Sequence, residues 1–75
     1  MSEQDLICLS GRRYEDRTVS GVVLGGRWLD ADDLAPEVWE RVKRTLQSGE
    51  VEDAPVGVEQ PDGDDGPTNY YYRLL

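Results

Sequence analysis

Histidine is absent from this chain of 75 residues, and cysteine occurs once, at Cys8. One cysteine cannot close a disulfide within the chain, and without histidine it cannot complete the four-ligand shell of a structural zinc ion. A chain of this length gains a net stability of only ~3–5 kcal/mol from a single core, and disulfides or metals are common reinforcements. Because both are excluded here, self-association or a partner protein is the reinforcement that remains.

Basic side chains are also scarce, with 8 Lys and Arg against 16 Asp and Glu, which gives a net charge of −8. Such a chain is repelled by the phosphates of nucleic acids and by anionic membrane surfaces, so we expect neither as a direct partner. Charge of this kind keeps a small protein soluble, and that is the simpler interpretation. The alternative is a nucleic-acid mimic that occupies a basic groove, with these acidic-surface candidates: Asp30, Asp32, Asp33, Glu37 and Glu40.

Long hydrophobic runs are missing as well. The apolar run Leu6–Leu9 is far shorter than the ~20 residues that a helix needs to cross a bilayer. Residues 1–5 carry two acids where a secretory signal carries basic charge. We therefore expect a cytoplasmic protein in which Cys8 stays reduced, and the apolar neighbours of Cys8 predict a buried, unreactive thiol.

The first half of the chain is predicted to contain three β-strands, at residues 5–10, 17–24 and 27–30. These segments are rich in apolar and β-branched residues, which favour strands. Gly25 and Gly26 supply the two positive-φ positions of a tight hairpin turn between the second and third strands. Gly21 interrupts the second strand, which indicates a bulge or a close approach of another backbone.

An amphipathic helix is predicted over residues 36–48. Pro36 suits the first helical turn, because its missing N–H would have no partner there, and Gly49 suits a left-handed C-terminal cap. The large apolar side chains recur with helical spacing on one face, which we expect to pack against the sheet. They are Val38, Trp39, Val42 and Leu46.

The remainder of the chain contains three segments that differ in amino-acid composition. Residues 50–58 have the composition of a weak strand, whereas the acidic segment 59–68 has no apolar anchor and is predicted to be a mobile loop. The final segment, 69–75, contains three tyrosines and two leucines, a composition with high β propensity. It either folds back as a strand or is a tail kept for a partner.

These elements together predict a small single α+β domain. In it, an N-terminal strand and the Gly-Gly hairpin pack on one amphipathic helix, and the Tyr-rich C-terminal strand joins the sheet. The compact body would span residues 1–58, followed by the acidic flexible loop 59–68 and the C-terminal strand or docking tail 69–75.

Two motifs that resemble binding sites lack the residues that the chemistry requires. Gly21–Trp28 has the glycine spacing of a phosphate-binding loop, but Arg27 and Trp28 stand where Lys and Ser or Thr are needed. Asp30–Asp33 begins like a calcium loop, but its twelfth position is Arg41 instead of a glutamate. We therefore predict no catalytic, metal or cofactor site, and no enzymatic activity.

Large aromatic and apolar side chains, more than one short helix can cover, favour a docking surface. The interface candidates are Trp28, Tyr70, Tyr71, Tyr72 and Leu74. These features favour a non-enzymatic protein–protein interaction module, which docks through exposed aromatics or a sheet edge on another protein or on a second copy. A regulator or inhibitor of a host protein, encoded by a phage or mobile element, is one instance. The alternatives are a structural assembly subunit, for example of a phage particle, and the acidic mimic described above.

Overall fold

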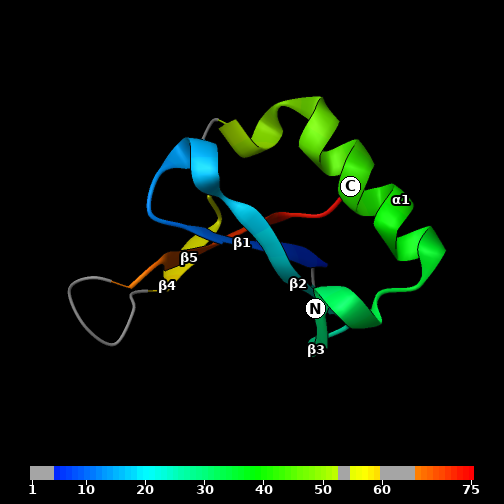
Figure 1. The fold of residues 1–75 in the computed structure, drawn as a ribbon. Coiled ribbons are helices and arrows are strands. Elements are labelled where there is room, and N and C mark those ends of the chain that lie inside the picture. The colour runs from blue at the N-terminus through cyan, green and yellow to red at the C-terminus, as the bar shows by residue number, and fades with distance from the viewer. Residues whose placement is uncertain (1–4, 53–54, 60–65) are drawn as a thin grey trace.

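The computed structural model describes residues 5–52, 55–59 and 66–75 of the chain. In this part of the chain, one α-helix lies across a five-stranded antiparallel sheet, which confirms the predicted α+β class (Figure 1). The strands are β1 (Leu6–Gly11), β2 (Thr18–Leu24), β3 (Arg27–Asp30), β4 (Gly57–Glu59) and β5 (Thr68–Arg73). The helices are α1 (Pro36–Ser48) and the 3-10 turns η1 (Tyr14–Asp16), η2 (Ala31–Asp33) and η3 (Glu50–Glu52).

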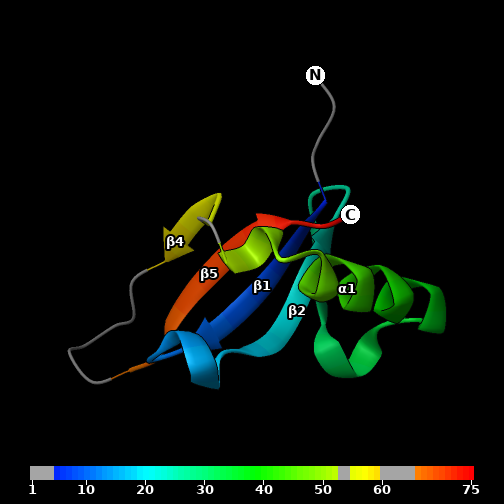
Figure 2. The same ribbon diagram turned by 90° about the horizontal axis from the view of Figure 1, so that it is seen from above.

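The sheet runs in the order β3-β2-β1-β5-β4, so the C-terminal strand β5 lies inside the sheet (Figure 2). β5 pairs with β1 along its whole length, from Thr68 opposite Gly11 to Arg73 opposite Leu6. On its other side it pairs with the three-residue edge strand β4. The prediction that the tail folds back as a strand is therefore confirmed. Most of the predicted mobile loop, residues 60–65, lies outside the described residues.

The hairpin between β2 and β3 turns at the two glycines, as predicted. Gly25 and Gly26 both have positive φ, at 57° and 80°. The close approach at Gly21 is also confirmed, because a Cβ there would lie 2.4 Å from the backbone oxygen of Leu29. A bulge falls next to this glycine: Cys8 and Leu9 are opposite Gly21 and Val19, which leaves Ser20 as the extra residue.

Helix α1 begins at Pro36 and ends before Gly49, whose φ of 82° is the left-handed conformation expected of a C-terminal cap. Val42 is fully buried, which confirms that this face of the helix packs on the sheet. Val38 and Trp39 are half-buried and pack against the same core, also as predicted.

The prediction that Leu46 is buried is wrong, since Leu46 is 39% exposed and Thr45 is buried in its place. The last turns of α1 meet the chain at Leu75 on the Thr45 side. The Thr45 hydroxyl donates to the carbonyl oxygen of Arg41 at 2.9 Å and accepts from the backbone N–H of Leu75 at 2.8 Å. With both hydrogen bonds made, the polar Thr45 side chain is buried at little cost, and Leu46 is turned toward solvent.

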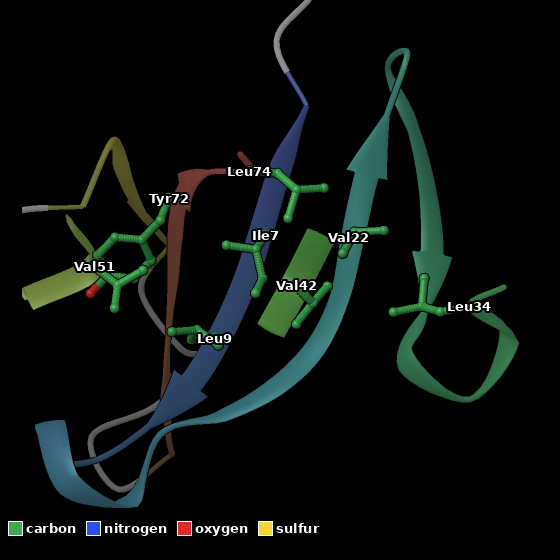
Figure 3. Close-up of a cluster of buried hydrophobic side chains, with 8 residues drawn as sticks. All are labelled: Ile7, Leu9, Val22, Leu34, Val42, Val51, Tyr72 and Leu74. Carbon is green, nitrogen blue, oxygen red and sulfur yellow. The ribbon is translucent and has the colours of Figure 1, made fainter. Parts of the chain in front are cut away.

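The hydrophobic core lies between α1 and the face of the sheet that looks toward it (Figure 3). Side chains from all three central strands, from α1 and from the segments at both ends of the helix contribute to it. The buried members are Ile7, Leu9, Val22, Leu34, Val42, Val51, Tyr72 and Leu74.

Polar contacts fasten one end of the β1–β5 pair, where Asp5 and Leu75 lie, to the helix. The Arg41 guanidinium donates to the carboxylate of Asp5 at 3.0 Å and to the carbonyl oxygen of Leu75 at 2.9 Å. The backbone N–H of Leu74 donates to the carbonyl oxygen of Asp5 at 2.9 Å, which extends the β1–β5 ladder by one bond. Arg41 therefore ties α1 to the sheet beyond the apolar core.

Candidate docking surface

The two faces of the sheet differ in what covers them. Directly opposite residues on neighbouring strands share a face, and side chains alternate between faces along each strand. Ile7, Val22 and Tyr72 are opposite one another and lie on the side of α1 (Figure 3). Leu6 and Cys8 therefore point away from α1, and none of the described elements packs over that second face (Figures 1 and 2). We call it the open face.

Two rows of cross-strand neighbours form the centre of the open face. Across β5, β1, β2 and β3, the first row is Arg73, Leu6, Val23 and Trp28. The second row, in the same strand order, is Tyr71, Cys8, Gly21 and Asp30. The apolar and aromatic members make up what we call the open-face patch: Leu6, Cys8, Val23, Trp28 and Tyr71. Charged side chains, Arg73 and Asp30, lie at opposite sides of this patch.

Trp28 is the most exposed large side chain of the patch, with 46% of its surface accessible. Its ring lies over Gly21, where a Cβ would come within 2.5 Å of the indole carbon Cζ2. The indole Nε1 donates to Asp30 Oδ1 at 2.9 Å, which fixes the direction in which the ring points. An exposed indole held in one orientation loses little conformational entropy on binding, and Trp is enriched among the anchors of protein interfaces.

Tyr71 and Cys8 lie side by side in the second row. The Tyr71 hydroxyl donates to Glu59 Oε2 at 2.7 Å. This hydrogen bond to a carboxylate, followed by burial, raises the pKa of Tyr71 well above its usual value. Burial also raises the pKa of the Cys8 thiol, which is only 1% exposed. Both groups therefore hold their protons at neutral pH, and the patch presents neutral apolar surface instead of a nucleophile or a base.

The structure divides the five predicted interface residues between the two faces. Tyr72 and Leu74 are 3% and 7% exposed and belong to the core, so the interpretation of these two as surface anchors needs correction. Tyr70 is half-buried on the helix side, where the Arg17 guanidinium stacks 3.7 Å from the centre of its ring. Strand alternation is the reason, because β5 turns residues 70 and 72 toward α1 and Tyr71 away from it.

Sequence reasoning missed Leu6, Val23 and Arg73 as members of this surface. The available signal was the unbroken apolar run Leu6–Leu9, since a strand that is apolar on both faces is typical of a position inside a sheet with both faces covered. The run predicts a buried strand, but it does not indicate which of its residues point away from the helix. Cys8 is buried as predicted, but it belongs to the open-face patch and not to the cluster of core side chains beneath α1.

The five acidic-surface candidates are all exposed, and they follow one another from the end of β3 through η2 into the first turns of α1. Asp30 is the one that also borders the open-face patch, through its hydrogen bond with Trp28. Glu40 lies 3.7 Å from Lys43 in a pair whose two side chains are mostly exposed, so this contact adds little stability. The candidates are Asp30, Asp32, Asp33, Glu37 and Glu40.

Comparison with protein-family models, with curated proteins and with solved structures finds no match for this chain. Within the described residues, no three His, Cys, Asp or Glu side chains are grouped so that they could hold a metal ion. The helix of the described part is too short and too polar to cross a membrane.

Proposed function

We propose that this chain is a non-enzymatic protein–protein interaction module that docks another protein, or a second copy of itself, on the open-face patch. The observation that carries the proposal is Trp28, an indole that is 46% exposed and held in place by Gly21 and Asp30. A side chain of this size, half in water on an uncovered sheet face, gains free energy when a partner covers it.

The chemistry of the patch supports a binding role. The patch contains one thiol, on Cys8, and one phenol, on Tyr71. Both have a raised pKa and keep their protons near neutral pH. A thiol and a phenol in that state are poor nucleophiles and poor general bases. A regulator or inhibitor of a host protein, encoded by a phage or mobile element and acting in the cytoplasm, is one form that such a module takes.

A matched pair of variants tests the proposal. Trp28→Ala removes an exposed apolar side chain from the open face, and Leu46→Ala removes one from the outer side of α1. Proteins captured from a host lysate by the tagged chain are identified, and their affinities for the purified wild type and both variants are measured. We expect Trp28→Ala to cost about 2 kcal/mol, or about 30-fold in affinity, and Leu46→Ala to change it little.

A second candidate function, the nucleic-acid mimic, is favoured by the five exposed acids that lie between the end of β3 and the first turns of α1. The salt dependence of binding separates the two. Docking on the open-face patch should weaken only modestly between low and moderate salt, because screening acts on exposed charges. Affinity that falls steeply with salt, together with a Trp28→Ala variant that binds like the wild type, would replace the docking proposal with the mimic.

A further inference from the structure

We infer that the occupant of the open-face patch is a second copy of this chain, so that two sheets pack face to face in a symmetric dimer. This inference rests on the proposed function and names its partner. The evidence for the dimer is the order of the side chains along the first row of the open face. This row is chemically complementary to the same row of a second copy that runs in the opposite direction.

In that row, a cation and an aromatic ring stand at opposite ends with apolar side chains between them. The order is Arg73, Leu6, Val23, Trp28. Neighbouring strands are about 4.8 Å apart, so Arg73 and Trp28 are separated by roughly 14 Å across three strand spacings. Arg73 is exposed, and the two residues between the ends, Leu6 and Val23, are half-buried.

Consider a two-fold axis that runs parallel to the strands and lies between β1 and β2. This axis places the row of one copy opposite the row of the second copy, with the order of the side chains reversed. Arg73 then faces Trp28 of the second copy, and Leu6 faces Val23 of the second copy. Both contacts occur twice, as they must in a closed two-fold interface. The twist of about 30° between packed sheets moves the row ends by only a few ångströms, which the long Arg73 side chain can span.

The paired groups suit one another chemically. A guanidinium is attracted to the face of an indole, and Trp is the best aromatic partner for a cation. The carboxylate of Asp30 lies next to that indole, bonded to its Nε1, and offers a further acceptor for Arg73. In the second row, the same axis places Cys8 opposite Gly21 of the second copy. Because the Trp28 ring covers Gly21, the indoles of both copies lie near the centre of the interface.

The net charge of −8 opposes association of two copies, but its distribution limits the repulsion. Exposed acids such as Glu37 and Glu40 lie on α1, which is on the other side of the sheet. Face-to-face packing keeps these acids on the outer surfaces of the dimer. On the open face itself, the axis brings Arg73 near Asp30 of the second copy, so two contacts between opposite charges are available across the interface.

The first experiment measures the mass of the full chain by sedimentation equilibrium over a series of concentrations. We expect a monomer–dimer equilibrium, and we expect Trp28→Ala to raise its dissociation constant by about 1,000-fold, because the substitution removes an indole worth ~30-fold from each of the two copies. Leu46→Ala is the control and should leave the equilibrium unchanged. A wild type that is monomeric at every concentration, while a host protein still binds in a Trp28-dependent manner, would overturn the dimer and leave the proposed function standing.

The second experiment tests the axis itself with two charge variants. Arg73→Glu and Trp28→Lys should each be monomeric alone, because each places unfavourable groups at both ends of the row. In an equal mixture, a heterodimer regains one native Arg73–Trp28 contact and one Glu–Lys contact, so mass should shift to the dimer. Two-dimensional NMR spectra of each variant establish that it is folded. Folded variants that stay monomeric when mixed, or a dimer that neither substitution weakens, would contradict this arrangement.

Discussion

Gly21 decides where the tryptophan of the docking surface lies. A Cβ at this position would come within 2.4 Å of the Leu29 backbone oxygen and 2.5 Å of the Trp28 ring. The indole therefore occupies the space above Gly21. From the sequence, the glycine indicated a bulge or a close approach without naming the neighbour. The neighbour depends on how far the ring of Trp28 leans across β2, and no local pattern carries that information.

Gly21→Ala should therefore destabilise the fold and displace the Trp28 ring. We expect the free energy of unfolding in urea to fall by about 1–3 kcal/mol, as is typical when a methyl group is forced into a filled space. Trp fluorescence should change in the folded baseline as well. Gly57→Ala in β4 is the matched control, because a Cβ there meets no atom within 4 Å. Equal effects of the two substitutions would show that the close approach at Gly21 carries no energetic weight.

The raised pKa of Tyr71 predicts a loss of stability in alkali. The folded state holds the Tyr71 proton more tightly than the unfolded chain, in which its pKa is about 10. The contribution of Tyr71 to the free energy of unfolding is therefore fully present below that pH, and it declines as the pH rises above it. Burial raises the pKa of Tyr72 and Cys8 in the same direction, so the whole decline begins at about pH 9.

Urea unfolding across this pH range, on the wild type and on Tyr71→Phe, measures the effect. The variant should lose stability less steeply above about pH 10, because one of the protons that favour the folded state is gone. Glu59→Gln should act in the same direction, since it removes the carboxylate that accepts the Tyr71 hydrogen bond. A slope in Tyr71→Phe as steep as in the wild type would contradict this account.

At the scale of elements, local signals predicted the hairpin and the helix well, and the partner of each element poorly. The turn at Gly25–Gly26, the cap at Gly49 and the buried Val42 all follow from local chemistry and helical spacing. The exposure of Leu46 does not, because it depends on the arrival of Leu75 beside Thr45, 30 residues away along the chain. Hydrophobic periodicity is a local signal and carries no information about contacts between residues so far apart in the sequence.

Two aspartate substitutions on α1 separate the predicted stripe from the observed one. Val42→Asp buries an unpaired charge at a fully buried position and should unfold a domain of this size. Leu46→Asp places the same charge on an exposed position and should change the free energy of unfolding by no more than about 0.5 kcal/mol. Thermal unfolding followed by circular dichroism checks both. A Leu46→Asp variant that fails to fold would restore the original assignment of Leu46 to the core.

At the scale of the whole molecule, the sheet order explains why the tail could be predicted only as a strand and not as a central one. The high β propensity of residues 69–75 favours a strand, but the pairing of Leu6 with Arg73 joins residues 67 apart in sequence. The same non-local pairing moves Tyr72 and Leu74 from the expected surface into the core. One surface anchor of the tail remains, Tyr71, which the sequence predicted together with Tyr70 and Tyr72.

Removal of residues 68–75 distinguishes a central strand from a dispensable tail. Because β5 pairs with both β1 and β4, and residues 68–75 contribute two buried side chains to the core, the shortened chain should lose cooperative unfolding altogether. Circular dichroism and NMR chemical-shift dispersion measure this. A shortened chain with a dispersed, native-like spectrum would mean that β1 is stable without its second neighbour.

The pairing of β1 with β5 also orders the events of synthesis. Chains emerge from the N-terminus onward, so β1, β2 and β3 are exposed before any residue of β5 exists. During that interval the apolar run Leu6–Leu9 forms an unprotected edge of a three-stranded sheet, which is a template for pairing with other nascent chains. The arrival of Thr68–Arg73 closes that edge. β5, which is made after β1, β2 and β3, thus protects the edge of β1 against aggregation.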